Sequence, residues 1–294
     1  MQFDRRYRYA ELRRPRFRPI PVRMLVPNFI TLLAICAGLT AIRLSTEGRM
    51  ELAVAAIVFA AVLDGIDGRV ARMIKGQSKF GAELDSLADF VNFGVAPGLM
   101  LYFWQLHELH NGGWIAAMVF AISGGLRLAR FNASMDDPNK PPFATNYFTG
   151  VPAPAGAVTA LLPIYLAFLG IPKPPATLSA LYTLLIAFLM VTRLPVYSGK
   201  SIRMRVPPEL VLPVFVCVIF FIALLIGYPW HILSAGSVVY LVSLPLGWKA
   251  YRDQKRAYDA AHAPTPAAAP QADAPSLASP VVDRPEDQRP ERLH

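Results

Sequence analysis

Four aspartates, grouped in two pairs, are the residues best suited to chemistry. Asp64 and Asp67 are three positions apart, and Asp85 and Asp89 are four apart. At these spacings, both members of a pair lie on one face of a helix. Apolar residues precede the first pair and follow the second, and the basic, glycine-containing stretch 73–80 separates the pairs. We therefore expect a helical hairpin with both acidic pairs near its turn.

An acidic cluster at the edge of a membrane needs countercharge. Inserting an ionised Asp into a bilayer costs about 2.5–3.5 kcal/mol of free energy, whereas inserting a Leu is favourable by only about 0.3–0.6 kcal/mol. Arg69 and Arg72 alone cannot neutralise four carboxylates. Mg²⁺ or Mn²⁺ prefers carboxylate oxygens, and two such ions would balance the charge. Residues 64–89 include no His or Cys, which argues against zinc. We predict a site for two Mg²⁺ or Mn²⁺ ions.

The residues around the aspartates suit a phosphorylated ligand. Gly68 and Ala71 would let a bulky group approach the helix backbone, and Arg72 offers a planar fork for phosphate. Further donors follow at Lys75, Ser78 and Lys79. Paired metal ions are a recurrent device for stabilising in-line displacement at phosphorus. A transfer reaction at phosphorus is therefore the expected chemistry.

The elements that must position these residues are apolar and long. Hydrophobic residues make up 54% of the 294-residue chain and charged residues only 17%. Eight apolar segments can be drawn, each near the roughly 20 residues that cross a bilayer. They are Pro27–Ser45, Met50–Arg72, Ala82–Trp104, Gly113–Phe131, Phe148–Leu169, Ala176–Thr192, Pro208–Gly227 and His231–Trp248. This pattern predicts an all-α, polytopic membrane bundle of about eight transmembrane helices, the fifth beginning irregularly at its Gly and Pro residues.

The basic residues indicate how the chain is organised and oriented. They gather in the arginine-rich segment 1–25, in alternate loops, and in the segment that follows residue 248, and they dominate the formal net charge of +9. By the positive-inside rule, both termini and the aspartate hairpin are cytoplasmic in a multi-pass protein of the cell (inner) membrane. We expect a basic tail (1–25), a transmembrane catalytic domain (26–248, with the motif at 64–89) and a largely disordered cytoplasmic tail (249–294). No nucleic-acid partner is expected, because the basic residues adjoin membrane segments. Cys36 and Cys217 lie inside apolar runs and are expected to be small buried hydrophobes.

The aspartate segment closely resembles the signature of the CDP-alcohol phosphatidyltransferase family. The signature is D-x-x-D-G-x-x-A-R, eight residues, then G-x-x-x-D-x-x-x-D, and every fixed position matches with the expected gap. The matching residues are Asp64, Asp67, Gly68, Ala71, Arg72, Gly81, Asp85 and Asp89. A preceding P-N-x-x-T at Pro27, Asn28 and Thr31 also resembles the family. The resemblance implies a helical membrane enzyme that transfers a phosphatidyl group from a CDP-linked lipid to an alcohol and releases CMP.

The resemblance also assigns roles by position. Asp64, Asp67, Asp85 and Asp89 would hold two divalent metal ions, and Asp89 would also take the proton of the acceptor hydroxyl. The residues expected at the CDP-linked lipid are Asn28, Thr31, Gly68, Ala71, Arg72, Ser78 and Gly81. The family further implies a homodimer among membrane lipids.

The acceptor alcohol is suggested by two further segments. Residues 125–132 (G-L-R-L-A-R-F-N) and 148–157 (F-T-G-V-P-A-P-A-G-A) resemble the phosphatidylserine synthase branch of the family. This implies CDP-diacylglycerol and L-serine as substrates, with Arg127, Arg130 and Asn132 as candidate acceptor-binding residues. Alternatively, the two arginines are only flanking charge, or the acceptor is glycerol 3-phosphate, inositol phosphate or choline. A cation transporter with the aspartates on its ion path is an alternative from another class.

Overall fold

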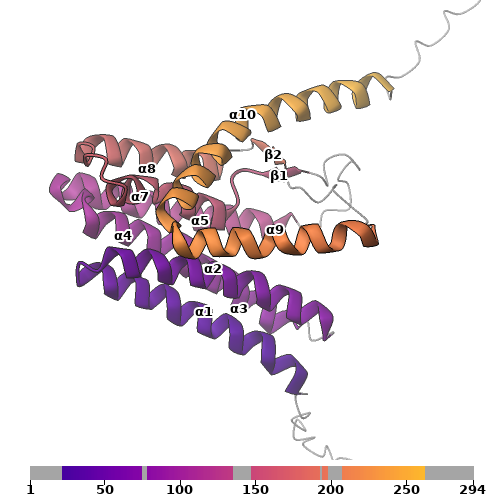
Figure 1. Cartoon of the computed structure of the whole chain (residues 1–294). Coiled ribbons are helices and arrows are strands. Elements are labelled where there is room, and N and C mark those ends of the chain that lie inside the picture. Colours follow the sequence, from indigo (N-terminus) through magenta and orange to yellow (C-terminus); the bar gives the residue numbers. More distant parts are fainter. Residues whose placement is uncertain (1–21, 75–77, 135–146, 193, 198–206, 262–294) are drawn as a thin grey trace, which may run out of the picture. The chain divides into compact units, whose positions relative to one another are not determined.

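The computed structural model describes residues 22–74, 78–134, 147–192, 194–197 and 207–261, and nearly all of them are helical (Figure 1). The elements preceding residue 150 are α1 (Val22–Thr46), α2 (Met50–Met73), α3 (Lys79–Asp89), the π-helix η2 (Phe90–Val95), α4 (Ala96–Trp104), the 3₁₀-helix η3 (Leu106–Leu109), α5 (Asn111–Ala133) and the strand β1 (Tyr147–Thr149). Those that follow are α6 (Ala153–Ala160), α7 (Leu162–Phe168), α8 (Ala176–Val191), the strand β2 (Pro195–Tyr197), α9 (Pro208–Gly227) and α10 (Pro229–Ala261).

Helices occupy all eight apolar segments drawn from the sequence. Among the described residues, five stretches are long and apolar enough to cross a membrane: Leu25–Thr46, Lys79–Trp104, Asn111–Ala133, Leu210–Gly227 and Pro229–Arg256. Two shorter apolar stretches, Ala153–Phe168 and Ala176–Val191, account for the fifth and sixth segments. The second segment is the 24-residue helix α2, whose charged residues set it apart from the purely apolar spans. The predicted all-α, polytopic membrane fold is confirmed.

Three details differ from the predicted segments. The third segment is not one regular helix, because the π-helical turn η2 interrupts it directly after Asp89. The fifth begins irregularly, as predicted, but it does so as the unpredicted strand β1, which pairs antiparallel with β2, before α6 starts at Ala153. The last helix runs on to Ala261, beyond the expected end of the span at Trp248. Residues 1–21 and 262–294 lie outside the described residues, as do the basic residues of the predicted cytoplasmic loops at Lys75, Lys140, Arg193, Lys200, Arg203 and Arg205.

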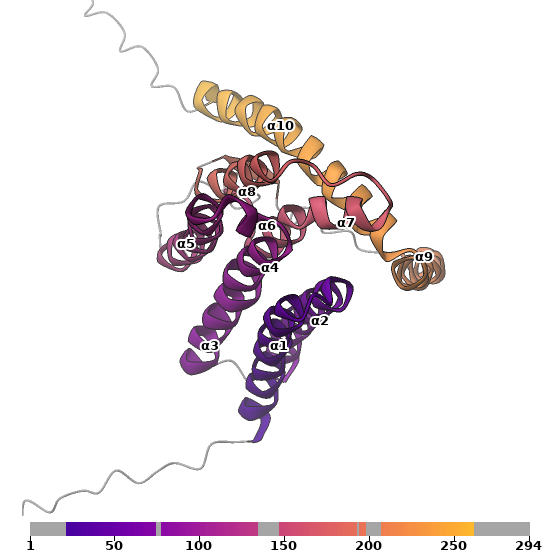
Figure 2. The same ribbon diagram turned by 90° about the vertical axis from the view of Figure 1, so that its left-hand side faces the viewer.

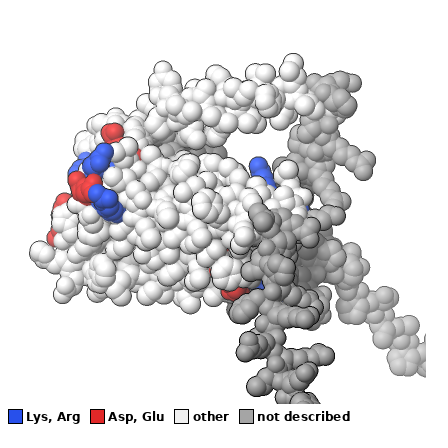
Figure 3. Space-filling view, turned by 90° about the horizontal axis from the view of Figure 1, so that it is seen from below, with Lys and Arg blue, Asp and Glu red and all other residues white. Residues whose placement is uncertain are grey.

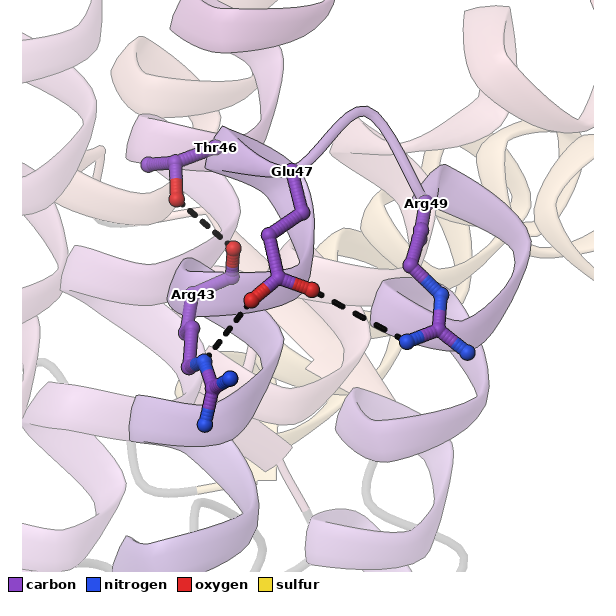
Figure 4. A network of polar contacts seen from close by, with 4 residues as sticks. All are labelled: Arg43, Thr46, Glu47 and Arg49. Atoms are coloured by element: carbon purple, nitrogen blue, oxygen red, sulfur yellow. Dashed lines mark hydrogen bonds and ion pairs between the residues drawn. The ribbon is translucent and has the colours of Figure 1, made fainter.

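The turn between α1 and α2 shows why these helices form a tight hairpin. The Gly48 N–H donates to the Ser45 carbonyl and the Arg49 N–H to the Leu44 carbonyl, the pattern of a Schellman motif. Gly48 adopts φ +76°, a left-handed conformation that glycine takes without a Cβ penalty. Glu47 pairs with Arg43 at 2.8 Å and with Arg49 at 3.8 Å over the turn (Figure 4). These exposed pairs contribute little energy, so the glycine turn and the packing of α1 against α2 define the hairpin.

Helix α4 and the π-helix η2 are central to the packing, because both contact α1 on one side and α5 on the other (Figure 2). Small residues permit the close approach to α5, as is usual between membrane helices. A Cβ at Gly98 would come within 2.9 Å of the Ala117 carbonyl oxygen, and one at Gly124 within 3.1 Å of the Gly94 Cα. This packing brings α5 against the segment that immediately follows Asp89.

Much of the protein surface is apolar. In Figure 3, acidic and basic side chains gather mainly at one edge, and a broad surface beside them carries none. No residue of Leu210–Gly227 is buried, although this is the most hydrophobic helix. Such a surface requires a lipid environment. Cys36 and Cys217 are free and exposed on it, so the expectation that they are buried was wrong.

Candidate active site

The carboxylates of the two acidic pairs come together as the hairpin predicted. Oxygen atoms of Asp64, Asp67 and Asp85 all lie within 4.8 Å of one another. Asp89 joins them through its side chain, which is within hydrogen-bonding reach of Asp64. Helix α2 supplies the first pair and α3 the second, and α1 contacts both of these helices. Four carboxylates from two helices therefore form one cluster.

Thr31 of α1 ties the cluster to the first helix. Its hydroxyl donates a 2.6 Å hydrogen bond to Asp67 Oδ2. Both residues are almost fully buried, with Asp67 3% exposed and Thr31 4% exposed. This contact fixes the orientation of one carboxylate before any ligand binds.

An open cleft of about 700 Å³ adjoins the cluster. It is lined by Pro27, Asn28, Thr31, Asp67, Gly68, Ala71, Arg72, Ser78, Lys79, Gly81, Ala82 and Asp85. All seven residues that the sequence assigned to the CDP-linked lipid line this cleft. Its volume falls in the range typical of small-molecule sites. The cleft is built from α1, α2, α3 and Ser78, the residue that precedes α3.

Local interactions explain how the start of α3 is held at the cleft. Ser78 is the N-cap, and its hydroxyl accepts a 2.9 Å hydrogen bond from the Gly81 N–H. A Cβ at Gly81 would lie 2.8 Å from Asn28 Oδ1, so a larger residue here would displace the Asn28 side chain at the wall of the cleft. Ser78, Gly81 and Asn28 therefore have clear structural roles in forming the wall of the cleft.

On the wall of the cleft formed by α2, Gly68 leaves open space and Arg72 offers unused hydrogen-bond donors. A Cβ at Gly68 would meet no atom within 4 Å, so packing within the protein does not explain this glycine. Arg72 uses its Nε to donate to the Gly68 carbonyl at 2.9 Å. The rest of its exposed guanidinium remains available to an anion.

The donor set fits a hard divalent cation. Each of Asp64, Asp67 and Asp85 offers a carboxylate oxygen at mutual distances that one ion could bridge. Oxygen ligands of this kind suit Mg²⁺ or Mn²⁺. The three carboxylates could therefore hold a metal ion.

The three candidate acceptor-binding residues on α5 have different surroundings. Arg127 is 8% exposed, stacks over the Phe131 ring and interacts electrostatically with Asp89. Arg130 instead donates through Nη1 to the Val191 carbonyl at the end of α8. Asn132 donates to the Ser86 hydroxyl at 2.9 Å. Of the three, Arg127 is the residue that interacts electrostatically with Asp89.

A buried polar group that the sequence reasoning missed interacts with Arg127. Tyr240 of α10 interacts electrostatically with Arg127. Asp89 Oδ1, Arg127 Nε and the Tyr240 hydroxyl are all buried without a hydrogen-bond partner. A signal was present in the sequence, since Ser234, Ser237 and Tyr240 recur every three residues within the predicted apolar segment His231–Trp248.

Comparison with known proteins assigns the chain to a family. Residues 24–196 match the CDP-alcohol phosphatidyltransferase family, and residues 209–245 match a second description, CDP-alcohol phosphatidyltransferase 2. The chain belongs to the CDP-alcohol phosphatidyltransferase family. The first match includes the cleft, the four aspartates and Arg127. Membership confirms the expectation of an enzyme of this class and decides against the cation transporter.

Relatives with curated descriptions support the same class. A CDP-diacylglycerol–serine O-phosphatidyltransferase of Mycobacterium leprae is 37% identical over 79% of this chain and 77% of its own length. One of Mycobacterium bovis is 50% identical over 47% of this chain and 48% of its own length. One of Helicobacter pylori (strain J99) is 40% identical over 50% of this chain and 60% of its own length. For the latter two, the similar region therefore spans about half of each relative.

Proposed function

We propose that this enzyme transfers the phosphatidyl group of CDP-diacylglycerol to the hydroxyl of L-serine, which yields phosphatidylserine and CMP. One observation carries the proposal. The carboxylate cluster adjoins a cleft lined by the residues expected at a CDP-linked lipid, and its fourth member, Asp89, interacts electrostatically with a buried arginine from a different helix. A phosphate donor and a carboxylate-bearing acceptor thus each have a complementary group beside the same aspartates.

The residues have distinct tasks in the transfer. Arg72 and the N-terminal end of α3, with Ser78 and Lys79, bind the pyrophosphate in the cleft. Asp89 accepts the proton of the serine hydroxyl. The serine oxygen then forms a bond to the phosphorus that carries diacylglycerol, and the bond from that phosphorus to the CMP oxygen breaks. Arg127 holds the serine carboxylate and so directs the hydroxyl towards Asp89.

We further propose that Asp64, Asp67, Asp85 and Asp89 hold two ions of Mg²⁺ or Mn²⁺. When bound, such ions neutralise the carboxylates and the negative charge that develops on the phosphate oxygens. The hydrogen bond from Thr31 keeps Asp67 in place for this purpose.

The choice of serine rests on the relatives and on Arg127. The three relatives described above are named for transfer to serine. Arg127 is positioned to pair with a carboxylate, which serine has and choline lacks. Glycerol 3-phosphate and inositol phosphate remain alternative acceptors, because their phosphate groups could also pair with the Arg127 guanidinium.

The proposal includes the place of the enzyme in the cell. We infer that it lies in the cell (inner) membrane with both termini and the cleft facing the cytoplasm, because the basic residues gather on that side. The acyl chains of CDP-diacylglycerol would then lie beside α1 and α2, with the pyrophosphate in the cleft. A homodimer, implied by the family, is part of the same proposal.

Release of CMP tests the proposed function. Purified protein in micelles with CDP-diacylglycerol and Mg²⁺ or Mn²⁺ is given serine, glycerol 3-phosphate, inositol phosphate or choline singly. We expect CMP release with serine alone and none after chelation of the divalent ions. Release only with another alcohol would keep the family and refute the choice of serine.

A further inference from the structure

A buried polar stripe runs along the inner face of α10. Ser234, Ser237 and Tyr240 recur at helical spacing and lie on one face. Ser234 and Ser237 are 6% and 2% exposed, and the Ser237 hydroxyl lies 3.5 Å from the Val158 carbonyl oxygen of α6. The hydroxyls of Ser234 and Tyr240 are buried without a partner. These three residues turn their polar groups towards the protein, whereas His231 and Ser243 of the same helix are exposed.

Burying a polar group without a hydrogen-bond partner is energetically unfavourable. A buried donor or acceptor without a hydrogen bond loses its interaction with water and gains nothing in return. The Arg127 Nε–H, the Tyr240 hydroxyl and Asp89 Oδ1 share this condition, and electrostatic interactions link Arg127 with both of the others. Three such groups from α3, α5 and α10 mark the place of a polar ligand rather than of the protein core.

The types of these groups define the ligand chemistry. A guanidinium only donates hydrogen bonds, and a tyrosine hydroxyl can donate one. Together they suit a carboxylate, whose two oxygens accept several. Asp89 Oδ1 accepts only, which suits a hydroxyl. A small molecule with a carboxylate and a hydroxyl would satisfy all three groups.

We propose that Tyr240 is an acceptor-binding residue whose hydroxyl donates a hydrogen bond to the carboxylate of the amino-acid acceptor, beside Arg127. This inference rests on the proposed function, since it needs an acceptor with a carboxylate. It gives α10 a role in selecting the acceptor, although the cleft for the CDP-linked lipid is built without α10.

The Tyr240→Phe variant tests this role, because it removes one oxygen and preserves the ring. Hydrogen bonds to a charged group contribute about 1.5–3 kcal/mol, so the KM for serine should rise at least about tenfold. The KM for CDP-diacylglycerol and the kcat at saturating serine should stay within about twofold of wild type. Loss of packing alone would not produce this selective change.

Tyr165→Phe is the matched control. The Tyr165 hydroxyl is also buried without a partner, but Tyr165 is on α7, where its ring stacks with Trp230. Removing this hydroxyl should leave the KM for serine unchanged. A rise of similar size in both variants would show that any buried hydroxyl matters and would overturn the proposal.

The acceptor that the wild-type enzyme uses shows whether the role of Tyr240 or the proposed function has failed. If wild type uses serine and Tyr240→Phe has the wild-type KM for serine, the role of Tyr240 is refuted and the proposed function stands. If wild type releases CMP only with an acceptor that has no carboxylate, the proposed function is refuted and the role of Tyr240 with it.

Discussion

At the scale of single residues, Asp89 has the most specific task. It lies within hydrogen-bonding reach of Asp64, and Arg127 interacts with it electrostatically. In Asp89→Asn, the amide cannot accept a proton, so we expect turnover to fall by at least about 10²-fold. Thermal unfolding in detergent without divalent ions should show no loss of stability, because one of several mutually repelling carboxylates is gone. Turnover within about threefold of wild type, in folded protein, would refute the role of Asp89 as base.

Gly68 tests whether the cleft holds the CDP-linked lipid. Gly65 and Gly68 both lie in α2, and a Cβ at either would meet no atom within 4 Å. Gly→Ala in a helix is favourable by about 0.5–1 kcal/mol, so both variants should be at least as stable as wild type. Only Gly68 lines the cleft. We expect Gly68→Ala to raise the KM for CDP-diacylglycerol several-fold, and Gly65→Ala to leave it unchanged. Equal KM values for the two variants would count against the proposed ligand of the cleft.

The site residues differed in how far the sequence could predict them. The residues of the acidic motif could be predicted, because one continuous stretch carries them and helical spacing brings them together. The polar spacing around Tyr240 is visible in the sequence, but its interaction with Arg127 could not be predicted, because Tyr240 lies some 150 positions beyond Asp89 and only the packing of α10 brings it there. The contacts of Arg130 with Val191 and of Asn132 with Ser86 also depend on this tertiary packing.

At the scale of elements, small residues set the distances between helices. The hydrophobic pattern predicted the eight apolar segments, because the length of a span follows from the thickness of the bilayer. The π-helical turn after Asp89 was not predictable from that pattern. It arises where Gly94 and Gly98 bring the segment close to α5, and π-helical turns often occur at functional sites. The strands β1 and β2 are three-residue elements that periodicity does not detect.

Adjacent glycines at the start of α5 provide a test of this packing. A Cβ at Gly113 would overlap the Leu106 carbonyl, whereas one at Gly112 would meet only the Leu109 Cβ, at 3.9 Å. We expect Gly113→Ala to destabilise the protein by about 1–3 kcal/mol, as overpacking does, and Gly112→Ala to change little. Melting temperatures in detergent measure both. A Gly113→Ala variant as stable as Gly112→Ala would contradict the close contact of α5 with η3.

At the scale of the whole molecule, the proposed topology places the cleft in the cytoplasm. The turn with Glu47 would then face the opposite side of the membrane, since α1 crosses between it and the cleft. With Cys36 and Cys217 replaced by alanine, a membrane-impermeant maleimide added to intact cells should label the Glu47→Cys variant. The Lys79→Cys variant should be labelled only after permeabilisation. The reverse pattern would invert the topology and place the cleft outside the cytoplasm.

The central claim is that one enzyme joins serine to the phosphatidyl group of CDP-diacylglycerol. The most direct test supplies isotopically labelled L-serine and CDP-diacylglycerol to the purified wild-type protein with Mg²⁺ or Mn²⁺. Mass spectrometry then identifies the lipid product, and CMP is quantified in the same sample. We predict labelled phosphatidylserine and CMP in equal amounts, and neither after chelation. CMP without labelled phosphatidylserine, or no turnover in folded protein, would contradict it.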